Sequence, residues 1–397
     1  MSEILLSQRA QSIKPSPTIA VSQRARELRA AGHDVIGLGA GEPDFDTPEH
    51  IKQAAKRAID EGFTKYTNAD GTDELKQAVI TKFERDNGLQ YKNDQILVSV
   101  GAKHSIFNLL QALVNSGDEV IIPAPYWVSY PDMVMLADGK PVVVSADMAA
   151  GFKISPEQLE GAITQRTRLL ILNSPSNPTG RVYSKDELAA LGEVLQRHPQ
   201  VLVATDDIYE HILWSGEPFA NIANACPDLM DRIIVINGVS KSYAMTGWRI
   251  GYAAGPSELI AGMKKIQSQS TSNPTSIAQV AAATALTGDQ SCLQPMVAAF
   301  KQRHDQVVKR LSQIKGLRCI PSEGTFYAFP NCTSAIEAMN SVSNDVELAE
   351  HILNEAGVAL VPGSAFGASG HLRLSYATDL DTLNDALDRI QRLLGTS

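Results

Sequence analysis

Short apolar runs alternate with segments of mixed polarity along most of the chain. Six of the runs have the length and the β-branched content of strands that are buried on both faces. Most of them are separated by segments with apolar residues at helical spacing, such as 185–197. This alternation predicts an α/β fold built on a largely parallel sheet. The predicted strands are 96–100, 120–122, 141–144, 169–172, 201–204 and 233–236.

A second block, which begins at about residue 299, has a different pattern. It opens with a long helical stretch and then mixes helices with short apolar runs, including 326–329 and 372–375. We interpret this block as a smaller lobe. In open α/β sheets the ligand lies beyond the carboxyl ends of the strands, so the residues directly after each strand are the candidates for function.

Composition and charge narrow the classes of function. The chain has 397 residues, 44% of them hydrophobic, which is enough for two domains or for one large and one small lobe. Its formal net charge of -9 gives no basic footprint, so neither a nucleic acid nor a membrane is a predicted partner. Residues 1–16 lack a signal-peptide core and no run of membrane-spanning length occurs, so we expect a soluble, unprocessed chain.

The four cysteines show no C-x-x-C motif and no other metal-ligand spacing. We interpret them as scattered small apolar side chains that suit a reducing cytoplasm, and we predict no metal site. They are Cys226, Cys292, Cys319 and Cys332.

Lys241 directly follows the predicted strand 233–236 and its short turn, and it precedes Arg249 by eight residues. A lysine at the mouth of a sheet is poorly solvated, and desolvation together with a neighbouring cation lowers the pKa of its amine. Such an amine is a nucleophile toward an aldehyde and can later carry a proton. The alternative is a solvated loop lysine, which is the usual environment of this residue type.

The run 238–251 around Lys241 resembles the cofactor-lysine signature of the class I aminotransferases, in particular the bacterial aspartate aminotransferase subgroup that includes aspartate/prephenate enzymes. The resemblance implies pyridoxal 5'-phosphate as the cofactor, with Lys241 forming a Schiff base with it and Arg249 holding its phosphate. It also implies the type I fold of pyridoxal-phosphate-dependent transferases, an α/β fold in which a large domain with a mostly parallel seven-stranded sheet joins a smaller α/β domain. The implied domains are an N-terminal arm with part of the small domain at 1–47, a large cofactor-binding domain at 48–298 and a small C-terminal domain at 299–397.

A glycine at the end of the first predicted strand offers a phosphate site. Gly101 precedes a helical segment, and backbone N–H groups at a helix N-terminus favour a phosphate, although an ordinary strand-to-helix turn would look the same. Together with the guanidinium group of Arg249, this turn would form a phosphate-binding cup. The resemblance places the backbone of Ala102 and Lys103 in that cup, with Ser240 nearby.

The residues after the strand 169–172 form the run Asn-Ser-Pro-Ser-Asn-Pro-Thr-Gly, which resembles the family's NPxNPTG loop. Proline fixes the backbone of such a loop, and the resemblance implies that the amide of Asn177 contacts the cofactor ring hydroxyl. A plain Pro/Gly turn is the alternative, but it explains only the prolines.

Two acidic residues, Asp206 and Asp207, follow the strand 201–204. By resemblance, an aspartate here pairs with the pyridine nitrogen of the cofactor and keeps it protonated, and the D-x-x-Y spacing to Tyr209 selects Asp206. Tyr209 then matches a tyrosine that hydrogen-bonds the ring hydroxyl. A helix cap is the alternative role for an aspartate at a strand end.

The resemblance places Trp127 flat against the cofactor ring, where stacking holds the ring plane still, and a buried core tryptophan is the competing interpretation. Arg373 alternates with apolar residues on the predicted strand 372–375, where an unpaired charge is costly, so we expect an anion to meet it. By resemblance that anion is the substrate α-carboxylate, with the backbone of Gly41 close to the same group.

Tyr66 matches a tyrosine that reaches the cofactor phosphate of the neighbouring subunit, and Ser272 has a similar implied role. An active site that is shared across a two-fold interface implies an obligate homodimer. The residues at 68–70 and 72–73 depart from the usual family pattern near this shared region, so cofactor affinity or substrate range could differ there.

Charge also guides the expected substrate. In the family's animal and enteric aspartate enzymes an arginine of the partner subunit, near the position of Ser268, binds the distal carboxylate, and this chain has none there. Lys103, with the hydroxyl groups of Ser16 and Thr18, instead resembles the bacterial subgroup, in which a lysine receives the acidic side chain. We therefore expect transfer of the amino group of L-aspartate to 2-oxoglutarate by a ping-pong cycle that gives oxaloacetate and L-glutamate.

Several alternatives remain open from the sequence alone. Prephenate could be a second acceptor, or the donor could be another amino acid. A β-elimination lyase of the same fold would keep the cofactor residues but need not place a cation at Lys103. A regulatory protein of this fold would carry a DNA-binding module or lack Lys241, and an unrelated carboxylate-binding protein would leave the cofactor motifs unexplained.

The resemblance thus assigns catalysis to Lys241, Asp206 and Tyr209, with the freed lysine amine removing the substrate α-proton. The residues expected to contact the cofactor are Ala102, Lys103, Trp127, Asn177, Asp206, Tyr209, Ser240, Lys241, Arg249, Tyr66 and Ser272. The residues expected to contact the substrate are Gly41, Trp127, Asn177, Arg373, Lys103, Ser16 and Thr18.

Overall fold

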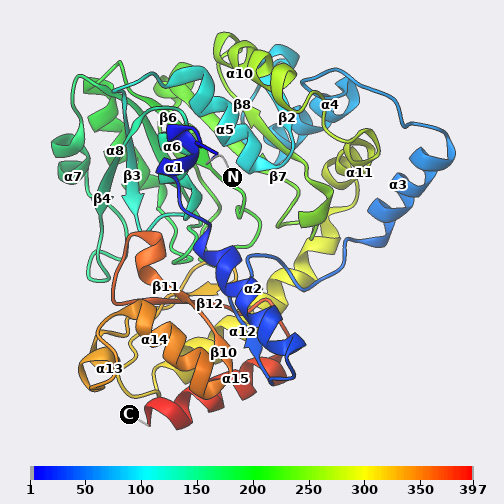
Figure 1. Ribbon diagram of the computed structural model, residues 1–397. Coiled ribbons are helices and arrows are strands. Elements are labelled where there is room, and N and C mark those ends of the chain that lie inside the picture. Colours follow the sequence, from blue (N-terminus) through cyan, green and yellow to red (C-terminus); the bar gives the residue numbers. More distant parts are fainter. Residues whose placement is uncertain (1–3, 396–397) are drawn as a thin grey trace.

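The structure, a computed structural model, describes residues 4–395. Its largest sheet contains the strands β2 (Ile96–Ser99), β3 (Glu119–Ala124), β4 (Lys140–Ser145), β5 (Thr167–Asn173), β6 (Leu202–Asp206), β7 (Ile233–Gly238) and β8 (Gly251–Ala254). The strand order is β2-β8-β7-β6-β5-β3-β4. Neighbouring strands are parallel from β7 to β4, whereas β8 runs antiparallel to both β2 and β7. The predicted mostly parallel seven-stranded sheet is confirmed (Figure 1).

Helices cover both faces of this sheet (Figure 1). They are α4 (Asp73–Lys82), α5 (Ala102–Leu113), α6 (Ser129–Leu136), α7 (Pro156–Ala162), α8 (Lys185–Arg197), α9 (Ile222–Ala225), α10 (Ser257–Ser270) and α11 (Ser276–Thr287), and α3 (Glu49–Asp60) packs against α11. Successive residues of a strand point to opposite faces, so Leu97 packs into a core with α5, α6 and α10, and Val98 into a core with α4, α8 and α11. The near-continuous apolar runs of the strands reflect this burial on two sides.

The helix α8 illustrates how local sequence sets an element. Ser184 accepts a hydrogen bond from the backbone N–H of Glu187, and the Glu187 side chain accepts one from the backbone N–H of Ser184, which forms a capping box. Leu188, Leu191 and Leu195 lie on one face of the helix and are buried against the sheet. The helix predicted at 185–197 is confirmed with the same bounds.

A second lobe follows in the chain. It contains α12 (Leu293–Leu311), β9 (Tyr327–Ala328), α13 (Thr333–Glu337), α14 (Asp345–His351), β10 (Val358–Ala359), β11 (Val361–Pro362), β12 (Leu372–Ser375) and α15 (Leu380–Leu394). Its three-stranded sheet has the order β11-β12-β9 with antiparallel pairs, and its core is formed by apolar side chains such as Phe300, Phe326 and Leu374. The strand predicted at 372–375 is confirmed, and the run 326–329 contains the shorter β9.

The N-terminal segment also reaches the second lobe. It contains α1 (Gln8–Ser12), α2 (Pro17–Ala30) and β1 (Ile36–Gly37), and β1 pairs in parallel with β10. The helix α12 begins with Leu293 in a core of the large sheet and continues with Phe300 in the core of the second lobe. The domain boundaries at 47/48 and 298/299 stay a prediction. Within residues 4–395, none of the helices combines the length and the apolar character needed to cross a lipid bilayer.

Candidate active site

A cavity of about 340 Å³ lies where the carboxyl ends of β5, β6 and β7 meet the second lobe. Open α/β sheets bind their ligands at this position, beyond the carboxyl ends of the strands. It brings together twelve of the residues selected from the sequence: Thr18, Gly41, Ala102, Lys103, Trp127, Asn177, Asp206, Tyr209, Ser240, Lys241, Arg249 and Arg373. The loops after separate strands therefore converge on one site.

Lys241 lies in the loop after β7, and its amine is the nucleophile candidate of the cavity. The amine donates a hydrogen bond to the backbone carbonyl of Gly41 and lies 5.9 Å from the centre of the Tyr209 ring. Desolvation lowers the pKa of this amine to about 8, and the positive charges of Arg249 and Arg373 act in the same direction. The negative charge of Glu42 opposes the shift. With this pKa, about a tenth of the amine is neutral at about pH 7, far more than for an ordinary lysine.

Asp206, the last residue of β6, is the acidic group of the cavity. Its carboxylate accepts a hydrogen bond of 2.6 Å from the hydroxyl group of Tyr130, and its backbone carbonyl accepts one of 2.8 Å from the Asn173 side chain. Desolvation raises the pKa of the carboxyl group to about 6, although the Tyr130 hydrogen bond opposes the shift. A cationic N–H group that enters the cavity would offset the cost of desolvating this carboxylate.

Asp207 has a different environment, although it is the next residue. Its carboxyl group accepts hydrogen bonds from the Thr205 hydroxyl at 2.6 Å and from the Asn221 amide at 2.7 Å, and it does not line the cavity. Successive side chains at a strand end point to opposite sides, which separates the two carboxyl groups. The placement agrees with the choice of Asp206 from the D-x-x-Y spacing.

Arg373 enters the cavity from β12 and is 2% exposed. Its two terminal nitrogens donate to the Asn177 side-chain oxygen at 2.9 Å and to the Gly39 carbonyl at 2.7 Å. Its Nε is buried without a hydrogen-bond partner, and no acidic side chain among residues 4–395 forms an ion pair with it. A buried guanidinium group with only neutral partners favours an incoming carboxylate.

The aromatic rings of the site fix Tyr209. Its hydroxyl group hydrogen-bonds the hydroxyl group of Tyr327 at 3.0 Å, and the Tyr327 ring lies under the Arg373 guanidinium group with a separation of 4.5 Å. Burial raises the pKa of the Tyr209 hydroxyl well above its ordinary value, so this group stays protonated and can donate a hydrogen bond.

The turn between β2 and α5 faces Arg249. Gly101 is the N-cap of α5 with φ of 86°, and Arg249 itself has a left-handed φ of 58°. A Cβ atom at position 101 would lie 2.4 Å from a terminal nitrogen of Arg249, so only glycine allows this approach. A helix N-terminus beside a guanidinium group is a site for a phosphate or another anion, and Ala102 and Ser240 line the cavity next to it.

Lys103 lies at the mouth of the cavity with its amine 4.7 Å from the centre of the Trp127 ring. Desolvation, and secondly the charge of Arg249, lowers the pKa of this amine. Thr18 also lines the cavity, and its hydroxyl group hydrogen-bonds that of Ser16 at 3.0 Å. Ser16 itself does not line the cavity.

Tyr66 and Ser272 are the other two residues that the cavity does not include. The side chain of Tyr66 is almost fully solvent-exposed, at 91%, and Ser272 is exposed with a left-handed φ of 61°. Their predicted contact with the phosphate of a neighbouring subunit is not tested within one chain and stays a prediction.

Sequence reasoning missed five residues that line the cavity: Glu42, Asn173, Ile208, Thr246 and Tyr327. It also missed Tyr130, which contacts Asp206 from outside the lining. Apart from Tyr130, which comes three residues after Trp127, they lie within the runs that had been singled out or directly beside a selected residue, but only the fold shows which neighbours point inward. Glu42 accepts a hydrogen bond from the Thr246 hydroxyl at 3.0 Å, a contact between segments that are 204 residues apart.

Comparisons with known proteins agree with this geometry. The family model for aminotransferase class I and II matches residues 33–390. The aspartate/prephenate aminotransferase of Nitrosomonas europaea is 58% identical over 98% of this chain and 99% of its own length, and the aspartate aminotransferase of Geobacillus stearothermophilus is 52% identical over 98% of each.

Solved structures of similar proteins have the same fold. The aspartate aminotransferase of Rhizobium meliloti is 48% identical, with a TM-score of 0.96 and complete coverage of both chains. The Thermus thermophilus aspartate aminotransferase with maleate is 44% identical, with a TM-score of 0.93 over 98% of this chain and 100% of that one. The chain is therefore an enzyme with the type I fold and belongs to the class I and II aminotransferase family.

Proposed function

We propose that this enzyme binds pyridoxal 5'-phosphate and transfers the amino group of L-aspartate to 2-oxoglutarate, giving oxaloacetate and L-glutamate. The observation that carries the proposal is the presence in one cavity of a lysine amine with a lowered pKa, a buried carboxylate and an arginine with no acidic partner. The names of the similar proteins support aspartate as the donor.

The residues present fit the cofactor. Lys241 offers an amine for its aldehyde, and the turn at Gly101 with Arg249 offers N–H groups for its phosphate. Asp206 offers a buried carboxylate for a protonated ring nitrogen, and Trp127 offers an aromatic face. When bound, pyridoxal 5'-phosphate supplies an electron sink that stabilises negative charge at the substrate α-carbon.

The side chains of the cavity then have separate tasks. Arg373 binds the substrate α-carboxylate with a charge-assisted fork and so orients the α-carbon, while Asn177 holds the guanidinium group in place. Lys241, as the neutral amine, accepts the α-proton of the donor and hands a proton on within the same half of the cycle; in the second half it delivers a proton to the α-carbon of the acceptor. Tyr209, which stays protonated, would donate a hydrogen bond to the cofactor ring.

Lys103 is the proposed partner of the distal carboxylate of aspartate, with the hydroxyl groups of Ser16 and Thr18 beside it. Its amine lies over the ring of Trp127, and both residues line the cavity. The same cation would accept a second carboxylate of prephenate, which we keep as a candidate second acceptor because similar proteins carry that name.

We further propose that the enzyme acts as a cytoplasmic homodimer with shared active sites. The exposure of Tyr66 and Ser272 supports the proposal, because an aromatic side chain that is 91% exposed is available to a second copy of the chain. We propose the domain division at 1–47, 48–298 and 299–397, which the separate cores of the two lobes support.

The first experiment mixes cofactor-loaded protein with L-aspartate alone and measures oxaloacetate by a coupled assay. One equivalent of oxaloacetate per loaded site, followed by L-glutamate when 2-oxoglutarate is added, is the expected result. Only aspartate can give oxaloacetate by transfer of its amino group. If another amino acid gives a keto acid and aspartate gives none, the substrate assignment changes and the reaction class stays the same. Continuous release of pyruvate with ammonia would instead identify a β-lyase.

A further inference from the structure

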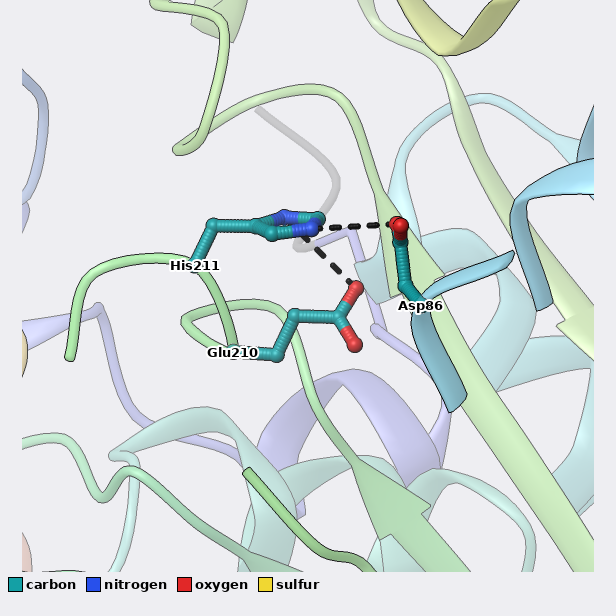
Figure 2. A group of neighbouring side chains, drawn as sticks. All are labelled: Asp86, Glu210 and His211. Carbon is teal, nitrogen blue, oxygen red and sulfur yellow. Dashed lines mark hydrogen bonds and ion pairs between the residues drawn. The ribbon is translucent and has the colours of Figure 1, made fainter. Parts of the chain in front are cut away.

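A cluster of charged side chains lies next to the Lys241 loop and outside the cavity. Figure 2 shows His211 with its ring between the carboxylates of Asp86 and Glu210. The Nε2 atom of His211 is 3.1 Å from an Asp86 oxygen, and its Nδ1 atom is 3.7 Å from a Glu210 oxygen. None of the three lines the cavity, so the proposed mechanism does not use them directly.

The three side chains could ligate a metal ion, but a protein cation already neutralises them. Lys82 is fully buried, and its amine forms an ion pair with Glu210 and lies 3.9 Å from an Asp86 oxygen. Arg85 adds a second positive charge against Asp86. Two acidic groups thus face two fixed cations, which removes the electrostatic demand for a divalent ion.

The hydrogen bonds of the cluster lead to both flanks of Lys241. On one flank, Glu210 accepts from the Asn237 amide at 2.7 Å, and the Asn237 oxygen accepts from the backbone N–H of Gly238, also at 2.7 Å. On the other flank, Nδ1 of His211 is 3.2 Å from the hydroxyl group of Ser242. Ser242 is the residue after Lys241 and is buried.

The opposite end of the cluster is anchored in the large domain. The second oxygen of Glu210 accepts a hydrogen bond from the Asn87 amide at 2.9 Å, and the side-chain oxygen of Asn87 accepts one from the Lys82 amine at 2.7 Å. Lys82 is the last residue of α4, and Asn87 is the last residue of the π-helical segment Phe83–Asn87 that continues it. Glu210 and His211 therefore connect the end of this helix to the loop that carries the reactive amine.

We propose that Glu210 and His211 are positioning residues that hold the Lys241 segment at a fixed distance from Asp206 and Tyr209. Both directly follow Tyr209 in the chain, so the segment that places Tyr209 in the cavity also hydrogen-bonds Asn237 before Lys241 and Ser242 after it. A displacement of reacting groups by about 1 Å can cost roughly a hundredfold in rate. The inference rests on the proposed role of Lys241.

The test uses variants that remove contacts without removing the buried ion pair. Ser242→Ala deletes one hydroxyl group, His211→Leu deletes the bridge, and His211→Gln restores a side chain that can donate to Asp86 and accept from Ser242. The matched control is His198→Leu, because His198 also pairs with a carboxylate, Glu160 at 2.8 Å, but does not line the cavity or contact its loops.

Three quantities are measured for each variant: kcat and KM of the loaded enzyme, the midpoint of thermal unfolding, and the pH dependence of Lys241 acetylation by acetic anhydride in the cofactor-free protein. The charged groups that act on this amine are Glu42, Asp206, Arg249 and Arg373, and all of them remain in the variants. The acetylation midpoint therefore reports where the amine lies relative to these groups and to solvent.

We expect Ser242→Ala and His211→Leu to lower kcat roughly tenfold or more with little change in KM. The acetylation midpoint should move from about pH 8 toward the ordinary lysine value, since a displaced amine is better solvated. The double variant Ser242→Ala/His211→Leu should have a kcat no lower than that of His211→Leu alone, and His211→Gln should recover much of the lost kcat. The control should keep native kcat and midpoint.

A lower unfolding temperature with native kcat per loaded site and a native acetylation midpoint would overturn the inference, because it would give the cluster a structural role only. Additive losses in the double variant would overturn it as well. The acetylation measurement needs neither cofactor nor substrate, so a failure of the proposed aspartate reaction would leave this test readable.

Discussion

The amine of Lys103 is a cation that the cavity offers in addition to Lys241, Arg249 and Arg373. Its position 4.7 Å over the Trp127 ring keeps it at the mouth, where a second carboxylate of the substrate would arrive. An ammonium group stacked on an aromatic ring exchanges this contact for a charge-assisted hydrogen bond when a carboxylate binds. Selectivity for dicarboxylic substrates would then depend on one side chain.

Lys103→Gln should raise the KM for L-aspartate roughly ten- to a hundredfold and leave the KM for L-alanine within about twofold, because only aspartate has a distal carboxylate. Steady-state kinetics with both donors and a saturating acceptor measure the difference. Equal losses for the two amino acids would remove Lys103 from the account of specificity.

Asp206 illustrates a conflict between stability and activity. Its folded-state pKa of about 6 is above the ordinary 3.8, so the ionised carboxylate lowers the stability of the cofactor-free protein as the pH rises through this window. Asp206→Asn should therefore raise the free energy of unfolding by about 2–3 kcal/mol at about pH 7.5, and by less at about pH 5. Urea unfolding of the cofactor-free protein at the two pH values measures the effect.

The same substitution should lower kcat roughly a hundredfold or more, because a neutral amide cannot stabilise a protonated ring nitrogen. Asp207→Asn is the control, since Asp207 is equally buried but faces Thr205 and Asn221 outside the cavity. A comparable fall in kcat for both variants would contradict the assignment of the ring contact to Asp206.

At the scale of elements, the turn from β2 into α5 sets the anion-binding corner. Gly101→Ala should lower the affinity for pyridoxal 5'-phosphate at least tenfold and destabilise the protein by about 1–3 kcal/mol, because the new Cβ atom would lie 2.4 Å from Arg249. Gly117→Ala is the matched control, since Gly117 has almost the same φ, 87°, with no atom within 4 Å of the added carbon. Cofactor titration and thermal unfolding separate the clash from the backbone strain that both variants share.

Local sequence pattern was enough for the elements that are buried on two faces or amphipathic. The six apolar runs coincide with strands, and α8 has the predicted bounds, because burial on both faces or on one stripe leaves a repeated apolar signal. The seventh strand, β8, was not identified from periodicity. Its sequence, Gly-Tyr-Ala-Ala, is short and consists mostly of residues with small side chains. Position 251 requires glycine, because a Cβ atom there would lie 2.1 Å from the backbone nitrogen of Ala102.

The candidate site divides in the same way. Residues directly after strands, such as Asp206 and Lys241, could be selected in advance because the fold places every strand end at one edge. The contact between Tyr130 and Asp206 joins residues 76 positions apart, and the contact between Tyr209 and Tyr327 joins residues 118 apart. Such pairs depend on how helices and lobes pack, which local periodicity does not encode.

At the scale of the whole molecule, the proposed homodimer predicts that two different inactive variants can complement each other in a mixed dimer. A Tyr66→Ala variant should bind cofactor weakly, and a Lys241→Ala variant should be inactive. In a mixed dimer, the subunit with intact Lys241 receives Tyr66 from the other subunit, so one complete site forms. Each mixed dimer should have about half of the native activity, and an equimolar mixture that reassociates at random should have about a quarter per dimer, because only about half of its dimers are mixed. Activity no higher than that of Tyr66→Ala alone would contradict shared sites.

The reactive amine and the proposed anchor of the substrate α-carboxylate come from different lobes, Lys241 from the loop after β7 and Arg373 from β12. Exchange of whole C-terminal segments between homologous genes would therefore alter the recognition of new amino acids while leaving the reactive amine untouched. Such recombination has to preserve the acceptors of the transplanted guanidinium group, the Asn177 side-chain oxygen and the backbone carbonyl of Gly39. It also has to preserve the contacts that the second lobe makes elsewhere, such as the pairing of β10 with β1 and the hydrogen bond between Tyr327 and Tyr209.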